Sequence, residues 1–499
     1  MPEQKSVQAM KSPQAILGVL PRALKRHGRF SARQNRVCPC QLMVIFMLST
    51  ISSCISNFIW SWLFFPGLIV CAGALTISCR ALQFRRFGLA MRLTVGSLRL
   101  RPAERKSGTV TPFQAAATAL GSTVGTGNIV GVSQAIAMGG PGALFWLWAA
   151  ALIGMIVKYA EVALAIYYRR GSIGSGPMDY ITNGLSRPRL ARVYGVLVTL
   201  SAFCMGNLVQ VSSIADSFVR AVDACTAGPM PSPAALRFAL GLVLTAVTAL
   251  LLSGGAGRVG TAAEALVPLM SLLFIAASMA VVAVNHSRIA VVMSTVFIEA
   301  FRPGAITGGI CGVTTAQCIQ WGLRRSAFSN EAGLGTAAIA HAAADTDEPA
   351  AHGMWGIFEV FADTIVICTC TALAILCSGV NIPWGSVTGT EVYQSALASV
   401  FGARVSAVFM AVTICLFAYT SVMGWAVYGS RCAGYISGKR GAAVYGVLFP
   451  CVCLCGCVMS TKGVWQIADM INALMPLPNL ISLLMLAPVV GKISRKIDT

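Results

Sequence analysis

The sequence predicts an all-α polytopic membrane protein with about eleven transmembrane helices. Of its 499 residues, 56% are hydrophobic and 11% are charged, whereas soluble domains carry about 25% charged residues. Apolar runs of about 20 residues, the length of a helix that crosses a bilayer, recur along most of the chain. Lys and Arg collect in alternate loops between these runs, as they do in multi-pass membrane proteins.

Each predicted span is an apolar segment bounded by polar or basic residues. One N-terminal span precedes a core of ten, and this core occupies about residues 108–490 of a single membrane domain, 43–499. The spans are expected at residues 57–79, 111–137, 141–168, 190–214, 236–253, 261–286, 304–323, 353–378, 405–428, 442–459 and 464–488.

The net charge of +20 is explained by topology rather than by nucleic-acid binding. If loop 80–107 is cytoplasmic, 22 Lys and Arg fall in inside loops and 6 in outside loops. Cytoplasmic loops of membrane proteins carry this excess, and anionic lipids of the inner leaflet attract it. We therefore expect a cytoplasmic C-terminus, a surrounding lipid bilayer and no nucleic-acid partner.

Residues 1–42 form a basic extension that does not fit this count. Eight Lys and Arg lie in residues 1–37, on the side that an odd number of spans places outside. Three interpretations stay open: translation starts near Met43 or Met47, residues 41–79 form two spans, or the segment is a disordered cytoplasmic extension joined to such a hairpin. We favour a dispensable extension outside the core, because no motif in it carries chemistry.

Residues 121–131 are expected to interrupt the first core span. Four glycines occur there together with Thr126 and Asn128, and each Gly costs a helix about 1 kcal/mol relative to Ala. Close helix packing through G-x-x-x-G faces is one explanation, but the amide of Asn128 needs polar partners in hydrocarbon. Irregular backbone at bilayer depth survives where protein encloses it or where it lines a cavity. The segment therefore predicts a site at which opened carbonyls and amides bind a cation and a carboxylate.

A second glycine-rich segment lies at 304–323. Gly304, Gly308, Gly309 and Gly312 fall within it, and it is the sixth core span, five spans after the first. Two interrupted spans at equivalent places in two five-span halves indicate a 5+5 inverted repeat. This repeat is inferred from spacing and hydropathy, since no internal sequence identity is visible.

Seven sequence runs carry a specific family resemblance. They are GTGNIVGVSQAIAMGGPGALFWLWAAALIGMIVKYAEVALAIYYR (125–169), GPMDYI (176–181), GNLVQVSSIA (206–215), FSNEAGLGTAAIAHAAA (328–344), FADTIVICT (361–369), FAYTSVMGWAVYG (417–429) and IADMINALMPLPNLI (467–481). In this order and length they resemble the sodium:alanine (glycine) symporter family. The resemblance implies a leucine-transporter-type fold within the amino acid–polyamine–cation superfamily, and uptake of alanine or glycine driven by sodium or protons.

The resemblance, with the chemistry of the side chains, gives a candidate substrate site. It comprises the residues of the unwound helix, a substrate-facing glutamine and a tryptophan that would wall the pocket: Thr126, Gly127, Asn128, Gln210 and Trp425. A glutamine can donate to a carboxylate and accept from an ammonium group. Two alternatives stay open, namely that Gln210 only joins helices and that Trp425 only packs between them.

A candidate cation site adjoins it. Thr420 and Ser421 fall in the eighth core span, where this fold generally places hydroxyl ligands of Na⁺, and carbonyls near Gly125 or Thr126 would complete the shell. Hard cations prefer oxygen ligands, which hydroxyls and carbonyls supply. The alternative is that these hydroxyls bond back to their own helix.

Acidic residues inside spans are functional suspects because burial of their charge is costly. Asp363 could hold a cation or relay a proton. Asn330 and Glu331 would follow the cytoplasmic end of the sixth core span, where they would join an inner gate or simply form a folded loop.

Two further polar residues of the spans and two of the connecting segments are assigned structural or isolated places. Lys158 and Glu161, three residues apart on one helix face, can pair with each other and are treated as structural. His341 and His352 are expected to be isolated, so no metal other than Na⁺ and no cofactor is expected.

The resemblance and the residues together predict an inner-membrane secondary transporter that imports alanine or glycine with a cation, most directly Na⁺, by alternating access. Proton coupling is the alternative within transport. A different class, an amino-acid-sensing receptor or a channel, is the second hypothesis. Neither an enzyme nor ATP coupling is expected, because no catalytic cluster or nucleotide-binding loop occurs. The oligomeric state is not predicted.

Overall fold

The computed structural model describes residues 58–96, 110–170, 174–226, 228–302, 313–387, 389–459 and 470–498, together with Ser56 and Ala468. In these ranges every regular element is a helix, apart from one isolated bridge between Val110 and Ala344. Eight of the described helices are long and apolar enough to cross a membrane. The predicted extension 1–42 and the glycines of 304–312 lie outside the described residues.

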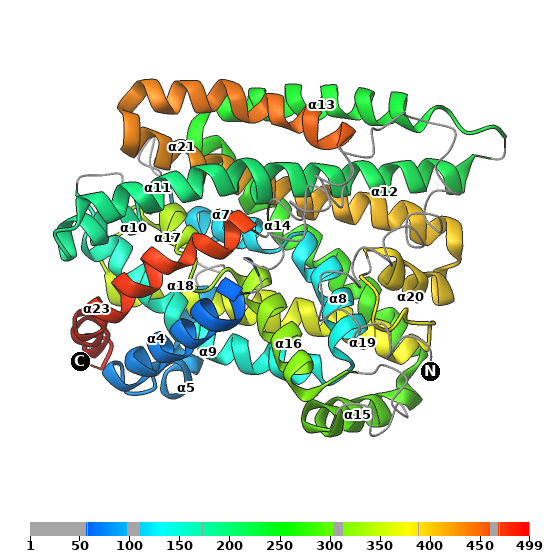
Figure 1. Cartoon of the computed structure of the whole chain (residues 1–499), viewed down its shortest axis with the longest axis horizontal. Helices are drawn as coiled ribbons and strands as arrows, with labels where there is room; N and C mark the ends of the chain where they lie inside the picture. Colours follow the sequence, from blue (N-terminus) through cyan, green and yellow to red (C-terminus); the bar gives the residue numbers. More distant parts are fainter. Residues whose placement is uncertain are drawn as a thin grey trace, which may run out of the picture. The chain divides into compact units, whose positions relative to one another are not determined.

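The described helices follow the order of the predicted spans (Figure 1). The long segments are η2 (Ile59–Phe64) with α4 (Phe65–Ser78), α9 (Ala143–Tyr167), α11 (Pro188–Phe203) with η6 (Cys204–Leu208) and α12 (Val209–Cys225), α13 (Pro233–Ser253), α14 (Gly255–Val284), α18 (Pro349–Val360) with η8 (Phe361–Cys368) and α19 (Thr369–Ser378), α21 (Ala403–Val458) and α23 (Pro476–Arg495). Shorter helices connect them: α5 (Leu82–Arg85), α6 (Phe87–Val95), α10 (Pro177–Asp179), η5 (Tyr180–Gly184), η7 (His286–Arg288), α15 (Ile289–Phe301) and α20 (Glu391–Phe401).

Helix α21 contains two of the predicted spans. Ser437 and Gly438 leave helical backbone geometry, and Gly438 has φ 64°. A glycine adopts this left-handed conformation without the steric cost of a side chain. The chain turns here, and its second part packs along α13 while the first part packs along α12 (Figure 1).

The first core span is interrupted as expected. Helix α7 (Pro112–Thr123) begins with a capping box in which Thr111 and Gln114 bond reciprocally, at 3.1 and 3.2 Å. It ends at Val124, whose φ of −74° and ψ of 87° are not helical. The π-helical turn η4 (Gly127–Gly131) and α8 (Val132–Gly139) follow. The glycine-rich segment thus breaks the span at Val124–Thr126.

A second break separates α16 (Thr315–Asn330) from α17 (Thr336–His341). Glu331, Gly333 and Gly335 have φ values of 56°, 92° and 80°, so the chain cannot continue as a right-handed helix. The interruption expected at the glycines of 304–312 lies outside the described residues, and residues 315–323 are continuous helix. The described break lies further along the chain, within residues 328–344.

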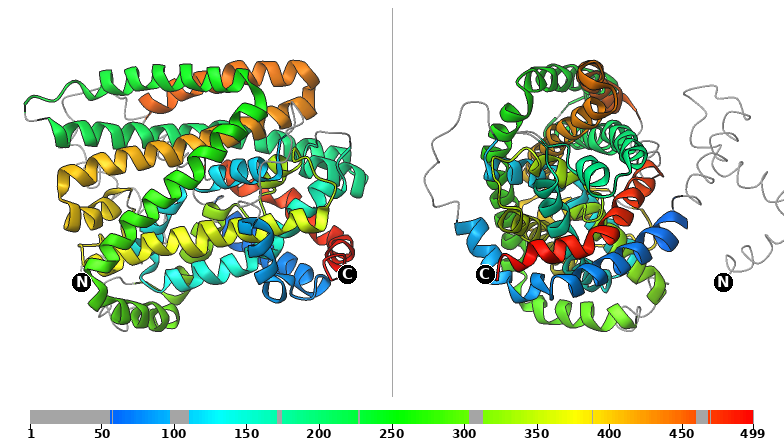
Figure 2. Two further views of the ribbon diagram at one scale, coloured as in Figure 1. Left: turned by 180° about the vertical axis from the view of Figure 1, so that it is seen from behind. Right: turned by 90° about the vertical axis from the view of Figure 1, so that its left-hand side faces the viewer.

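The C-terminal helix packs against the first. Helix α23 runs beside α4 (Figure 2), and beyond it Asp498 accepts hydrogen bonds from Arg85 at 2.7 and 2.8 Å and from Arg86 at 3.0 Å. The hydrogen bonds from Arg85 lower the pKa of Asp498 to about 2. Loop 80–86 and the C-terminus therefore lie on the same side of the domain.

Candidate substrate and cation site

Asn128 closes the break in the first core span. Its side-chain Oδ1 accepts a hydrogen bond from the Gly125 backbone amide at 3.0 Å, and the backbone amide of Asn128 donates to the Gly125 carbonyl at 3.3 Å. The Asn128 side chain is fully buried. A short polar side chain that bonds its own backbone competes with helical hydrogen bonding, which explains why the helix opens here.

The side-chain amide of Asn128 also connects the break to Asp363. Asn128 Nδ2 donates to Asp363 Oδ1 at 2.7 Å, and the other carboxylate oxygen, Oδ2, accepts from Ser329 and Thr364 hydroxyls at 2.8 Å each. Asp363 is fully buried. We call Asn128, Asp363, Ser329 and Thr364 the Asp363 cluster. It joins η4, α16 and η8, and its oxygens are of the kind that hard cations prefer.

Gln210 meets the break from the third core span. The Thr126 hydroxyl donates to Gln210 Oε1 at 3.1 Å, while Gln210 Nε2 donates to the Met205 carbonyl at 3.3 Å. Met205 belongs to η6, a π-helical turn, and such turns recur at functional sites because they widen the backbone locally. Gln210 therefore faces the break with its acceptor oxygen.

The structure separates the two predicted hydroxyl ligands. Ser421 lies at the break: its hydroxyl donates to the Gly121 carbonyl at 3.3 Å, and a Cβ added at Gly125 would overlap Ser421 Oγ. Thr420 instead donates to the carbonyls of Leu416 and Phe417 in its own helix, at 3.0 and 2.9 Å. Ser421 also bonds back to its own helix, at the Phe417 carbonyl, 3.1 Å away. The back-bonding alternative thus holds for both hydroxyls, and Ser421 differs from Thr420 by its additional contact with the break.

Trp425 lies one helical turn beyond Ser421 on α21. Its indole is fully buried and packs on Tyr428 with ring centroids 5.6 Å apart. A Cβ added at Gly206 would overlap the Trp425 ring, so the tryptophan fills the space beside η6, one turn before Gln210.

The predicted gate residues, Asn330 and Glu331, lie at the end of α16 and are buried. Asn330 donates to the Thr364 hydroxyl at 3.0 Å, and Glu331 accepts from the Thr336 hydroxyl at 2.5 Å. Phe328, which the sequence analysis did not single out, lies against the first break, with its Cδ1 3.2 Å from a Cβ added at Gly127. Helix α16, which ends at Asn330, packs on η4 and η8.

Two expectations, a pair of Lys158 with Glu161 and isolated side chains at His341 and His352, are wrong. The Lys158 ammonium lies 3.3 Å from Glu359, whereas Glu161 accepts from the Gly333 and Gly335 amides. His341 and His352 are not isolated, since their nitrogens Nδ1 and Nε2 are 2.9 Å apart. His341 Nε2 is in turn 2.6 Å from a Glu359 oxygen.

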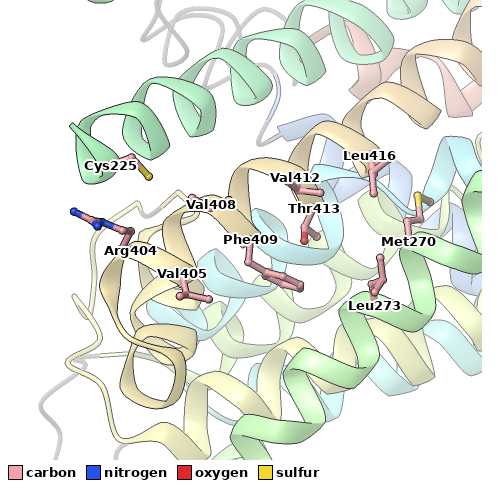
Figure 3. Close-up of a pocket in the computed structure, with 10 residues that line it drawn as sticks. All are labelled: Cys225, Met270, Leu273, Arg404, Val405, Val408, Phe409, Val412, Thr413 and Leu416. Carbon is pink, nitrogen blue, oxygen red and sulfur yellow. The ribbon is translucent and has the colours of Figure 1, made fainter. Parts of the chain in front are cut away.

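A pocket adjoins Thr420, whose hydroxyl bonds the carbonyl of one lining residue, Leu416, and lies 3.6 Å from Sδ of another, Met270 (Figure 3). Its volume is about 540 Å³, and its lining from α12, α14 and α21 is almost wholly apolar. Figure 3 shows Arg404 at one end and Met270 toward the other. A zwitterion needs polar partners when it leaves water, so this pocket does not suit a small amino acid.

Comparison with known proteins places the chain among transporters. A model of the sodium:alanine symporter family matches residues 45–498. The sodium/alanine symporter AgcS of Methanococcus maripaludis is 37% identical over 448 residues, which cover 87% of this chain and 94% of AgcS. GlnT of Bacillus subtilis (strain 168), described as a probable sodium/glutamine symporter, is 33% identical over 87% of each chain.

A solved structure supports the fold assignment. The crystal structure of MhsT in complex with L-phenylalanine aligns with a TM-score of 0.53, covering 77% of this chain and 98% of MhsT. At 13% sequence identity this similarity shows the fold alone, which is the leucine-transporter type.

Proposed function

Because the chain belongs to the sodium:alanine symporter family, we propose that it imports a small neutral amino acid, alanine or glycine, together with Na⁺. The observation that carries this proposal is the break at Val124–Thr126, which is joined to Asp363 through Asn128 and to Gln210 through Thr126. An opened transmembrane helix offers amides and carbonyls to a zwitterion and a cation at one place.

The substrate carboxylate would bind the amides of Thr126 and Gly127 at the start of the second half of the first core span. A helix N-terminus attracts anions through its free amides and its dipole. Gln210 Oε1 faces the same break and would accept from the substrate ammonium group. Trp425 fills the adjoining space and would exclude larger side chains.

The coupling Na⁺ would bind beside Ser421, with backbone carbonyls of Gly125 and Thr126. Ser421 contacts both the break and the Phe417 carbonyl of its own helix, while Thr420 bonds carbonyls of its own helix and would have to turn toward the break to join. Cation binding would hold the opened backbone in the geometry that the carboxylate requires, so each ligand would strengthen binding of the other.

Asp363 supports a second candidate within transport, proton coupling. Its carboxylate is fully buried and bonded by three donors from three side chains, so it could carry either a cation or a proton. Replacing Asp363 with Asn leaves a similar shape that cannot change its charge. If transport is proton-coupled, the Asp363→Asn variant should lose uptake driven by a pH gradient. If transport is sodium-coupled, uptake by the parent protein should follow the Na⁺ gradient at every pH.

Orientation and partners follow from the same account. The protein would reside in the cytoplasmic membrane with its C-terminus inside, in contact with lipid, and the α16–α17 break with Asn330 and Glu331 would take part in gating. An amino-acid receptor or a channel on the same fold would bind alanine without accumulating it.

Competition for uptake tests the proposed substrate. The protein is reconstituted in lipid vesicles, and uptake of labelled alanine is measured with and without Na⁺ against a panel of unlabelled amino acids. Alanine and glycine should compete, while leucine and phenylalanine should not. Equal competition by the large amino acids would contradict the proposed pocket, and competition by glutamine would widen the substrate class toward that of GlnT.

A further inference from the structure

Two oppositely charged residues of α9 hold the break between α16 and α17. Lys158 Nζ donates to the carbonyl of Asn330, the last residue of α16, at 2.7 Å. Glu161 Oε1 accepts from the amides of Gly333 and Gly335 at 3.0 Å each. Lys158 and Glu161 are both fully buried. They lie about one helical turn apart on α9. Lys158 therefore meets the end of α16, and Glu161 meets the backbone that follows it.

The signs of the two charges match the backbone groups they meet. A helix ends in carbonyls that carry partial negative charge, which a lysine near the C-terminus stabilises. Successive amides in left-handed geometry form a concave donor site for an anion, and Gly333 and Gly335 have φ values of 92° and 80°. Exchanging the two charges would place like charges together on both sides.

Neighbouring spans complete the partners of this segment. Asn479 of α23 donates to Glu161 Oε1 at 2.8 Å and to the Gly333 carbonyl at 2.9 Å. Glu359 of α18 lies 3.3 Å from Lys158, and Tyr194 of α11 donates to the Leu334 carbonyl at 2.8 Å. Opened backbone inside a membrane protein is stable only when its polar groups are satisfied in this way.

The break is also linked directly to the Asp363 cluster. Asn330 Nδ2 donates to the Thr364 hydroxyl at 3.0 Å, and this hydroxyl donates to Asp363 at 2.8 Å. Ser329, the residue before Asn330, donates to the same carboxylate oxygen, Asp363 Oδ2. A shift of the Asn330 carbonyl would therefore move two ligands of the cluster.

We propose that Lys158 and Glu161 are positioning residues that clamp the α16–α17 break and so fix Ser329 and Asn330 against Asp363. The clamp replaces the local Lys158–Glu161 ion pair expected from sequence. The role assigned to it in transport depends on the proposed function, whereas the clamp itself depends only on the contacts above.

Hydrogen exchange of the full-length purified protein tests the clamp without reference to any substrate. In Glu161→Leu, the amides of Gly333 and Gly335 lose their acceptor and should exchange at least about tenfold faster. Glu161→Gln, which fits the same space, should show a smaller rise and serves if the Leu variant does not fold. Glu299→Gln alters another buried carboxylate, on α15, and should leave this segment unchanged. Unchanged exchange in both Glu161 variants, or an equal rise in Glu299→Gln, would overturn the clamp.

Uptake by double variants separates a clamp from a local ion pair. Lys158→Met and Glu161→Gln should each lower kcat/KM for alanine at least tenfold at equal membrane abundance, while Lys158→Arg, which keeps a donor for the Asn330 carbonyl, should retain most of it. If the two residues merely neutralised each other, Lys158→Met/Glu161→Gln would transport better than either single variant. The clamp predicts a double variant no better than the worse single one. If the parent protein takes up no alanine, the proposed function fails while the exchange result still judges the clamp.

Discussion

Asn128 and Asp363 are 235 positions apart in the chain and are joined by a hydrogen bond of 2.7 Å between Asn128 Nδ2 and Asp363 Oδ1. Through it, the opened backbone of the first core span is bonded to a buried carboxylate of the seventh. The same Asn128 side chain also accepts a hydrogen bond from the Gly125 amide. Binding of a substrate or cation at the break would therefore change the hydrogen bonding of Asp363 through Asn128.

Replacing Asn128 with Ala should abolish most transport. The variant removes the hydrogen bonds to Gly125 and to Asp363, and a hydrogen bond to a charged group is worth about 1.5–3 kcal/mol. We expect kcat/KM for alanine uptake to fall at least about tenfold, since about 1.4 kcal/mol corresponds to a factor of ten. Asn285→Ala is the matched control, because Asn285 bonds only the Val281 carbonyl of its own helix among the described contacts. Equal uptake by both variants would remove Asn128 from the site.

Replacing Ser421 with Ala should weaken sodium dependence more than substrate binding. The Ser421 hydroxyl lies at Gly125, and its loss would take one oxygen from the proposed cation shell. The Na⁺ concentration for half-maximal uptake should rise about tenfold, a loss of about 1.4 kcal/mol, with KM for alanine little changed at saturating Na⁺. Ser253→Ala, at an exposed serine that bonds the Leu250 carbonyl, should behave as the parent. An unchanged sodium dependence in Ser421→Ala would place the cation elsewhere.

Shortening Trp425 should broaden the range of substrates. The Trp425 ring packs against Gly206, and Trp425→Leu would leave unfilled volume beside the break. Valine and methionine should then compete with labelled alanine at concentrations at which they do not affect the parent protein. Trp62→Leu is the control, since Trp62 is 71% exposed. If competition stays restricted to small amino acids in Trp425→Leu, another residue sets the size of the pocket.

Gly335→Ala should destabilise the protein more than Gly255→Ala. Both glycines have positive φ, at 80° and 66°, so both variants acquire the same type of backbone strain, about 1–2 kcal/mol. An added Cβ at Gly335 would also meet Tyr194 Oη at 2.6 Å and Pro177 Cγ at 2.8 Å, whereas nothing lies within 4 Å at Gly255. Such overpacking costs about 1–3 kcal/mol more. Thermal unfolding of the purified variants measures the difference. Equal midpoints would contradict the prediction and show that the α16–α17 break rearranges at little cost to accommodate the added Cβ.

The first break could be predicted from the sequence because its cause is local. Glycines and Asn128 disfavour a helix within a few residues, and the structure opens the helix at Val124–Thr126. The glycines at 304–312, where a second interruption is expected, lie outside the described residues. The described break depends instead on Glu331, Gly333 and Gly335 and on partners from other spans.

Pairing of buried charges could not be predicted from spacing. Residues three apart on a helix can always pair locally, yet Lys158 bonds the carbonyl of Asn330, 172 positions away. The contact of His341 with His352 likewise depends on the fold between them, since α17 ends at His341 and α18 begins at Pro349. Residues such as Gln210 and Trp425 become candidates for the substrate site through the family resemblance, because helical periodicity alone does not distinguish a binding residue from a packing residue.

Accumulation of alanine in lipid vesicles under an imposed Na⁺ gradient, at equal pH on both sides, tests the central claim most directly. With Na⁺ high outside, labelled alanine should rise inside the vesicles above its external concentration and then decline as the Na⁺ gradient dissipates, and a K⁺ gradient of the same size should drive none. Alanine that merely equilibrates, or that accumulates only under a pH gradient, would contradict sodium symport by this protein.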